Sequence, residues 1–523
     1  MGLISSVRGV LAIVKVIQMC GAVAAAALCL QAQDVKEFEK HITEFTLPNG
    51  LQFVVMERHD APAVSFFTYV RAGSAFDPAG RSGLANLFEQ ALFTGSDTIG
   101  TKNWNEEKKA LDTLETLYDE LETERNLVPK AAQSRIDSLE SQIRIAASAA
   151  ERLGQPKAFS TLLDENGSPR LSLNTTPDGS ECSYSLPSNR LELWFLLESQ
   201  RLMHPSFRGF YAARDAVATE RERKLDGPSL LYAKLAATAF EAHPYRNLSI
   251  GWPGDLLSLR RADARAFWER YYVPGNVSIA IVGDVNPADA KRFATQYFGS
   301  WAAKPVPGGV RTLEPQQLGP KRVALEAHPP AGRPNPPMMA VIGYKRPSQH
   351  DKDDAALDVL QIVLGQGKTG LLQKEIVGEQ HAAQAVQVRA TFPAGQYPNL
   401  FTFALVAGSG RSLDESERAL EEYLNRLKLQ RIELPVIDRA KAQARVSLIG
   451  RLTSNPGIAG MLGGYQAEYR DWRKLFSTAD DWSKVTADDL QRVLIRYFVP
   501  ANRTTVYTTL PGQPELAPAG GKK

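Results

Sequence analysis

An internal repeat is the feature that most constrains how this chain can fold. The segment 270–276 reads Arg-Tyr-Tyr-Val-Pro-Gly-Asn, and the segment 496–502 reads Arg-Tyr-Phe-Val-Pro-Ala-Asn. In both copies a helix-like stretch precedes the motif and a strand-like run follows it. Two copies of one helix–turn–strand unit so far apart predict two homologous halves. The alternative is a chance match.

A Pro- and Gly-rich connection divides the chain into these two halves. The connection covers residues 303–337, the N-terminal half covers 38–302, and the C-terminal half covers 338–514 before a flexible tail at 515–523. Strand-like and helical runs do not alternate one for one along either half. This favours an α+β fold of sandwich units over a doubly wound sheet.

A highly charged segment, 105–153, stands apart inside the N-terminal half. Apolar residues recur in it at helical spacing on both sides of Pro129. A proline ends one helix and allows a second to begin. The segment therefore predicts an antiparallel helical hairpin, an arm that packs on its own domain or on a partner.

The first 32 residues have the pattern of a secretory signal peptide. Arg8 and Lys15 precede an apolar run too short to span a bilayer, and charged sequence follows Ala32. An uncleaved N-terminal anchor is the alternative. Beyond this segment Cys182 is the only cysteine, which excludes an intrachain disulfide and a cysteine metal cluster. We expect an exported, periplasmic protein with no stable membrane insertion after cleavage.

Composition and charge exclude several classes of protein. Hydrophobic residues make up 43% and charged residues 23% of the 523 positions, which is typical of a globular chain rather than a disordered or collagen-like one. The formal net charge is +3. A nearly neutral chain gives no reason to expect nucleic acid or an anionic membrane as partner.

A helix predicted to begin near Leu84 carries three polar side chains on one face. Asn86, Glu89 and Gln90 are three and four positions apart, so they point in the same direction. Two carboxamides and one carboxylate, judged by residue type alone, favour a solvated or hydrogen-bonded face over a catalytic one.

The same helix resembles a catalytic motif. Residues 86–90, Asn-Leu-Phe-Glu-Gln, stand where the pitrilysin/insulinase-like (inverted zincin) metallopeptidases carry His-x-x-Glu-His. The Leu-Pro-Asn-Gly turn at 47–50 matches as well. Residues 213–220 are similar to the family's Glu-Arg-x-x-Val-x-x-Glu helix, which places Glu220 at the distal ligand position and Ala213 where the first Glu stands. The resemblance implies two pitrilysin-like halves that form a clamshell chamber, with the helical hairpin as an insertion.

The departures from the family motif concern the zinc ion. In active relatives two histidines and the distal Glu hold zinc, and the motif Glu activates water. A carboxamide is a weak, uncharged metal ligand, so Asn86 and Gln90 remove two of the three expected ligands and leave Glu220. Without a metal that lowers the pKa of water, Glu89 is a remnant general base. We therefore expect no cofactor and no catalysis.

Two further motifs give no support to an enzyme. Active relatives use an Arg and a Tyr in the second half to bind substrate, and the aligned positions here are Val377 and Gln384. Residues 365–370 satisfy Gly-x-Gly-x-x-Gly, but they follow a predicted helix rather than a strand. Nucleotide binding is therefore not supported.

The sequence favours a zinc-free pseudopeptidase that binds peptides or serves as the non-catalytic subunit of an active metallopeptidase, as a heterodimer with a homologous chain. The strand that contains Leu173, Asn174 and Thr175 is the candidate edge for peptide addition, and an interior strand is the alternative. Two other functions stay open. One is an active metalloendopeptidase with atypical ligands that hydrolyses unfolded peptides, and the other is a structural subunit that docks through the helical arm.

Overall fold

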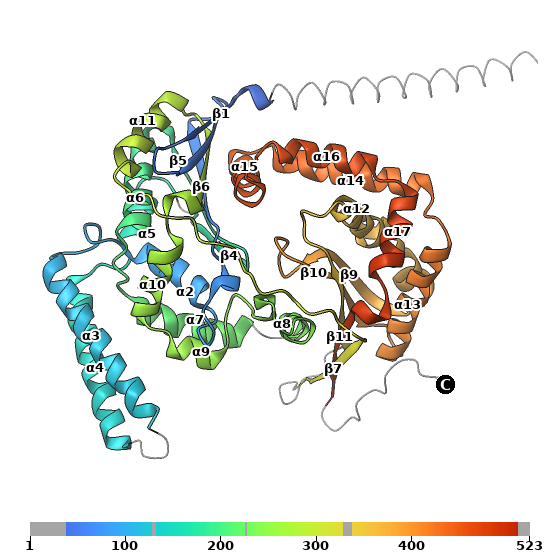
Figure 1. Ribbon diagram of the computed structural model, residues 1–523, viewed down its shortest axis with the longest axis horizontal. Helices are drawn as coiled ribbons and strands as arrows, with labels where there is room; N and C mark the ends of the chain where they lie inside the picture. Colours follow the sequence, from blue (N-terminus) through green and yellow to red (C-terminus); the bar gives the residue numbers. More distant parts are fainter. Residues whose placement is uncertain (1–37, 128–131, 169, 225–226, 328–336, 511–523) are drawn as a thin grey trace, which may run out of the picture.

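The computed structural model has two α+β halves side by side, each built on one sheet covered by helices (Figure 1). The expected signal peptide and the expected tail lie outside the described residues. Within the described part, no helix is long and apolar enough to cross a membrane. The structure describes residues 38–127, 132–168, 170–224, 227–327 and 337–510.

The first half contains a six-stranded sheet in the order β1–β2–β6–β3–β5–β4. Strand β2 runs parallel to β6, and the other neighbouring pairs are antiparallel. The turn between β1 and β2 has Gly50 at φ 95°, the left-handed conformation for which an Asn-Gly turn is suited. The strands are β1 (Ile42–Thr46), β2 (Gln52–Glu57), β3 (Ala63–Val70), β4 (Ser172–Thr175), β5 (Ser180–Pro187) and β6 (Val277–Gly283).

The second half repeats this topology with five strands in the order β7–β11–β8–β10–β9. Strand β7 is parallel to β11 and the other pairs are antiparallel, as for β2 and β6 in the first sheet. The repeated sequence motif leads into β6 in one half and into β11 in the other. The homologous halves expected from the repeat are therefore present. The strands are β7 (Lys321–Glu326), β8 (Met339–Arg346), β9 (Ala383–Phe392), β10 (Asn399–Ala407) and β11 (Arg503–Thr509).

Alternate residues of a strand point to opposite faces of the sheet. Helices cover the faces that carry apolar side chains. In the first half, Phe53 and Phe66 share an apolar core with Trp194 of α6 and Phe298 of α11. The helices of the first half are α2 (Leu84–Ala91), α3 (Trp104–Arg125), α4 (Gln133–Leu153), α5 (Ala158–Glu165), α6 (Leu191–Met203), α7 (Phe210–Lys224), α8 (Pro228–Ala239), α9 (Pro253–Ser258), α10 (Arg261–Tyr271) and α11 (Pro287–Phe298). Those of the second half are α12 (Asp354–Gly365), α13 (Leu413–Leu429), α14 (Leu434–Arg451), α15 (Asn455–Tyr469), α16 (Lys474–Lys484) and α17 (Ala487–Tyr497).

Each half contributes one helix that packs on the sheet of the other half. Helix α15 of the second half packs on β3 and β6 of the first sheet, and α8 of the first half packs on β8 and β11 of the second. Both helices lie between the halves in Figure 1. At Gly463 a Cβ atom would stand 2.3 Å from Phe67 and 3.3 Å from Ala280. A side chain there would hold α15 away from the first sheet, so glycine permits the close approach.

One strand lies inside the segment expected to be an irregular linker. Strand β7 forms an edge of the second sheet, although its residues fall within 303–337. The surrounding prolines suggested irregular structure. The strand forms because its six residues pair in register with β11, from Lys321–Thr504 to Glu326–Thr509. Tertiary pairing therefore outweighs the local composition.

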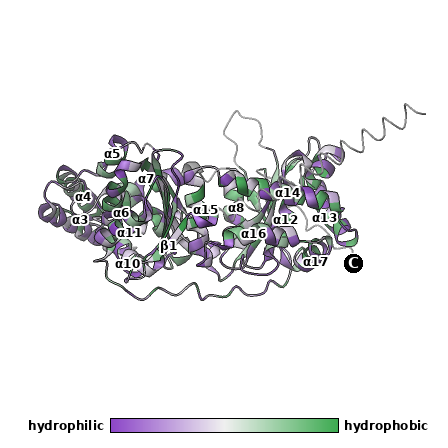
Figure 2. Cartoon of the chain, turned by 90° about the horizontal axis from the view of Figure 1, so that it is seen from above, coloured by the Kyte–Doolittle hydropathy of each residue, from purple (hydrophilic) through white to green (hydrophobic). Residues whose placement is uncertain are grey.

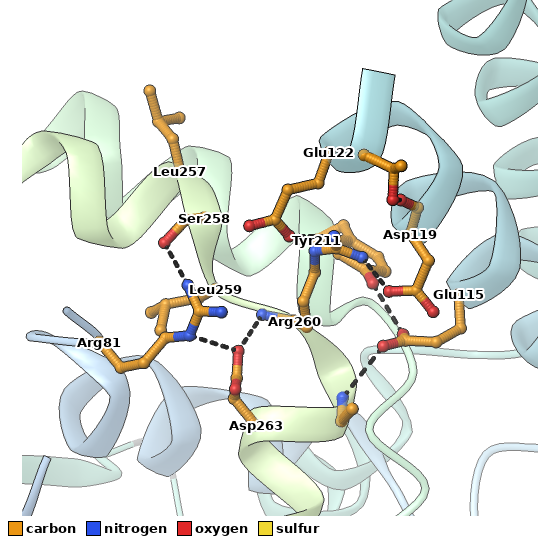
Figure 3. Close-up of polar contacts among 12 residues, drawn as sticks. Arg81, Glu115, Asp119, Glu122, Tyr211, Leu257, Ser258, Leu259, Arg260 and Asp263 are labelled. Carbon is orange, nitrogen blue, oxygen red and sulfur yellow. Dashed lines mark hydrogen bonds and ion pairs between the residues drawn. The ribbon is translucent and has the colours of Figure 1, made fainter. Parts of the chain in front are cut away.

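The helical hairpin of α3 and α4 projects from the first half, away from the second (Figure 1), and its surface is largely hydrophilic (Figure 2). Acidic residues in the middle and the C-terminal part of α3 attach the hairpin to the body. Glu115 accepts hydrogen bonds from the Tyr211 hydroxyl at 2.7 Å and from the Ala262 amide at 3.1 Å. Arg260 forms ion pairs with Asp119 and Glu122 (Figure 3). The hairpin is thus held against the body along α3, beyond its base.

Candidate functional site

Helix α2, which carries the motif face, begins at a carboxylate cap. Asp77 accepts hydrogen bonds from the backbone amides of Gly83, at 2.8 Å, and Ala85, at 2.9 Å. Burial raises the pKa of Asp77 to about 8 even though these amides favour its charged form. The cap satisfies amides at the helix start, which would otherwise lack partners. It therefore fixes where the motif face begins.

The two helices that carry the candidate residues of the metal motif lie in contact. Helix α7, which carries Glu220, packs against α2. Asn86, Gln90 and Glu220 are half-buried, whereas only 2% of Glu89 is exposed. The topology thus keeps α7 beside the motif helix. The chemistry of the site is decided by the surroundings of Glu89.

Both carboxylate oxygens of Glu89 are engaged inside the protein. The Arg201 guanidinium donates to Oε1 at 3.3 Å, and the Tyr272 hydroxyl donates to Oε2 at 2.9 Å. Arg201 also donates to both carboxylate oxygens of Glu198, at 2.5 and 3.0 Å. All four side chains are buried. We call Glu89, Glu198, Arg201 and Tyr272 the buried charge cluster.

Burial dominates the electrostatics of this cluster. Loss of hydration raises the pKa of Glu89, while the Arg201 charge and the Tyr272 hydroxyl oppose the rise. The neighbouring Glu198 carboxylate raises the pKa further, because its negative charge repels the charge on Glu89. The pKa of the Tyr272 hydroxyl is also well above its usual value, mainly through burial. Glu89 is therefore a structural acceptor in the core.

Sequence reasoning did not identify the partners of Glu89. Arg201 and Glu198 lie on α6, and Tyr272 lies just after α10, so all three are distant from Glu89 in the chain. One signal was present in the repeat. The first copy has Tyr272 where the second copy has Phe498, and a buried tyrosine hydroxyl needs a hydrogen-bond partner.

The donor set does not fit a zinc ion. Zinc in proteins takes thiolate, imidazole or carboxylate ligands, and this face offers the carboxamides of Asn86 and Gln90. The Glu89 carboxylate is committed to Arg201 and Tyr272. Among the described residues, no three His, Cys, Asp or Glu side chains are placed to hold a metal ion. These residues therefore support no chemical step through zinc.

The candidate peptide strand lies at a sheet edge. Among the described strands, β4 pairs with β5 alone and ends the order of the first sheet. The Thr176 amide donates to the Gly179 carbonyl in the connecting turn, so the alternating antiparallel pattern turns the backbone polar groups of Leu173 and Thr175 away from β5. Asn174 points its side chain to Glu181, to which its amide donates at 3.1 Å. Strand β4 also contacts α2, so the edge lies beside the motif helix.

The remaining motif positions lie outside the buried charge cluster. Val377 is half-buried in a helical turn, and Gln384 is exposed on β9. The segment 365–370 follows α12, as predicted, rather than a strand. His243 is buried, accepts from the Tyr245 amide at 3.2 Å, and has a pKa lowered to about 4 mainly by burial.

Comparisons with known proteins agree with this architecture. A family profile described as "Peptidase M16 inactive domain" matches residues 258–444. The zinc protease PqqE of Helicobacter pylori is 27% identical over 314 residues, which are 57% of this chain and 66%, just under two thirds, of the relative. A crystal structure of a protease from Helicobacter pylori covers 90% of this chain and 99% of its own, with TM-score 0.73 and 21% identity. The chain has the pitrilysin-like M16 fold.

Two other solved structures share this pitrilysin-like fold. A peptidase M16 inactive domain from Pseudomonas fluorescens is 17% identical with TM-score 0.67, and the match covers 90% of this chain and 98% of that one. The periplasmic protease PqqL of Escherichia coli is 13% identical with TM-score 0.66. That match covers 90% of this chain and 47% of PqqL, so this pitrilysin-like chain spans about half of the longer protein.

Proposed function

We propose that this pitrilysin-like protein is an exported, zinc-free pseudopeptidase that captures extended peptides at the β4 edge. One observation carries the proposal. The Glu89 carboxylate, which aligns with the general base of the family, is enclosed in the buried charge cluster. The enclosure is independent of the sequence departures at Asn86 and Gln90, yet it points to the same loss of catalysis.

A general base must reach the water it deprotonates. That water must lie within about 2.6–3.2 Å of the carboxylate. In this protein Arg201 and Tyr272 occupy the hydrogen-bonding positions of the two Glu89 oxygens. Release of Glu89 toward the helix surface would leave Arg201 with one carboxylate and break two buried hydrogen bonds. Glu89 therefore stabilises the core instead of activating water.

Peptide capture is supported by the open side of β4. An edge strand presents unpaired N–H and C=O groups, and an extended peptide can add to them as a further strand. The outward groups belong to Leu173 and Thr175, and the strand is short, with Ser172 and Asn174 exposed. A short edge limits self-association while it leaves two residues available for pairing.

Export and a partner subunit are parts of the same proposal. The periplasmic location of PqqL supports export, as does the signal-like segment at 1–32. A homologous chain with an intact zinc motif is the proposed partner, because a peptide bound by this chain needs a separate catalytic site. Copurification with such a relative, encoded by the same genome, is the direct test of this part.

Zinc content tests the loss of catalysis. The wild-type protein, incubated with excess zinc and desalted, is expected to retain far less than one equivalent by elemental mass spectrometry. The Asn86→His, Gln90→His double variant is expected to retain about one, because two imidazoles then join Glu220. A wild-type protein that holds stoichiometric zinc and cleaves unfolded peptides would establish the alternative, an active enzyme with atypical ligands.

Peptide capture is tested at Thr175. The Thr175→Pro substitution removes an outward N–H, so we expect binding of fluorescent unfolded peptides to weaken at least severalfold by anisotropy. Thr175→Val is the matched control, since it keeps the N–H and the side-chain shape. Equal binding by wild type and both variants would refute β4 as the peptide site.

A further inference from the structure

A small cavity lies between the two halves, apart from the motif helix. Its volume is about 160 Å³, which is several times what one water molecule needs. It is lined by β3, by the end of α15 and by the turn between β4 and β5, and residues 307–309 of the connection close one side. Both halves and the connection therefore contribute walls to the same cavity.

Two arginines line this cavity without an ion-pair partner. Arg71 donates through Nη2 to the Gly275 carbonyl at 2.5 Å, while its buried Nη1 has no hydrogen-bond partner among the described residues. Arg470 lies at the exposed end of α15, and within the described part of the chain neither arginine forms a salt bridge. Burial and then the charge of Arg470 lower the pKa of Arg71 to about 10. The two cations therefore lie near one another.

Two carboxylic acids line the same cavity. Asp178 accepts from the Tyr245 hydroxyl at 2.6 Å and from the Gln396 amide at 2.9 Å. Glu468 accepts from the Gln349 side chain at 3.1 Å. Burial raises the pKa of Glu468 to about 7, and the Asp178 charge raises it further in the same direction. Like charges are thus neighbours here, and among the described residues no arginine forms an ion pair with either acid.

The two arginines and the two acids together determine which ligand charges the cavity favours. A simple anion would satisfy the arginines but face Asp178 and Glu468, and a simple cation would face the reverse repulsion. A molecule with both charges complements both groups, because charge-assisted hydrogen bonds form at each end. Arg71 lines the cavity, and its Nη1 has no acceptor among the described residues, so a side-chain shift that brought this donor to a ligand carboxylate would satisfy a group that is costly to leave unpaired.

We infer that this cavity binds a small zwitterion with an α-ammonium and an α-carboxylate group, as in a free amino acid or a dipeptide. The size of the cavity excludes a long peptide. At Gly309 a Cβ atom would stand 2.6 Å from the Tyr397 hydroxyl, so the wall there is close. The cavity adjoins the turn after β4 through Asp178, but the inference does not depend on peptide capture at β4, because Arg71, Glu468 and Arg470 lie outside that strand.

Calorimetric titration of the full-length protein with glycine and glycylglycine tests the inference. Binding of glycine alone identifies a free amino acid as the ligand, and tighter binding of glycylglycine identifies a dipeptide. Two analogues test each charge separately: N-acetylglycine lacks the ammonium group, and glycinamide lacks the carboxylate. Both are expected to bind about tenfold or more weakly than the preferred zwitterion, the loss of one charge-assisted hydrogen bond.

Substitutions test whether the ligand binds in this cavity. Arg71→Gln is expected to reduce affinity about tenfold or more, and Glu468→Gln to reduce affinity for zwitterions but not for N-acetylglycine. Arg144→Gln, on the exposed hairpin, removes the same charge elsewhere and should leave binding unchanged. If Arg71→Gln unfolds, the melting temperature of the wild-type protein is measured with each ligand instead. The zwitterion should raise this temperature and the two analogues should not. Absence of binding at millimolar concentration, or equal binding of the analogues, would overturn the inference.

Discussion

Corresponding positions of the two halves carry Tyr272 and Phe498, and their surroundings differ in kind. The Tyr272 hydroxyl donates to Glu89 within the buried charge cluster. Phe498 packs among apolar residues that include Phe401 and Phe403. One backbone unit is therefore stabilised by a buried ion cluster in the first half and by aromatic packing in the second. The difference shows that the two halves kept their topology while their cores diverged.

A buried ion cluster contributes less to stability than its short distances suggest. Removal of three charges from water costs several kcal/mol for each ion, and the internal attractions largely offset that cost. An apolar core of similar volume often gives equal or greater stability. Loss of a single member is different, because it leaves the other charges buried without compensation. The change in the free energy of unfolding on a single substitution therefore distinguishes the two halves more clearly than the stability of the intact protein does.

The largest effect is expected from Arg201→Met. The change leaves Glu89 and Glu198 buried with no cation, which typically costs about 3–5 kcal/mol of the free energy of unfolding. Urea unfolding followed by circular dichroism measures the loss. Addition of Glu89→Gln to Arg201→Met should restore part of it. A loss below about 1 kcal/mol would show that water reaches the cluster.

A smaller effect is expected when the two repeat positions are exchanged. Tyr272→Phe removes a donor from Glu89, and Phe498→Tyr places a hydroxyl among aromatic rings. Each leaves a buried polar group unsatisfied, so each should destabilise the protein by about 1–3 kcal/mol. Thermal unfolding of both single variants measures this. Stabilisation by either exchange would contradict the contrast between the cores.

The smallest effect is a pH dependence at α12, the helix of the second half that follows β8 as α2 follows β3. Burial and the neighbouring Asp354 raise the pKa of Asp358 to about 7. A raised carboxyl pKa means that the folded state binds the proton more tightly, so this group lowers stability as pH rises from about 4 through 7. Asp358→Asn should reduce that decline by an amount on the order of 1 kcal/mol. Denaturant unfolding at pH 5 and pH 8 compares the two proteins, and an identical decline would refute the assignment.

Local signals in the sequence predicted most of the fold. The Asn-Gly turn, the helix that begins at Leu84 and the repeated motif depend on neighbouring residues, and each matches the structure. The hairpin of α3 and α4 follows from apolar spacing around one proline. Strand β7 was missed because its pairing with β11 involves residues far along the chain. Its own composition carries little of that information.

The candidate site was predictable only in part. Residue types at Asn86 and Gln90 are sufficient to question zinc binding, because ligand chemistry is a property of each side chain. The enclosure of Glu89 depends on Arg201 and Tyr272, which no local pattern connects to it. The cavity at Arg71 is formed by both halves, so it requires the assembled structure.

The packing of α8 and α15 on the opposite sheets determines what would happen if the chain were made as two separate pieces. If the coding sequence were divided in the connection, the first product would expose Val54 and Phe67, and the second would expose Val341 and Val506. Each product alone would then present an apolar sheet face of the kind that promotes aggregation. The two products of such a split would each need the other to cover this apolar face, which would turn one chain into an obligate pair.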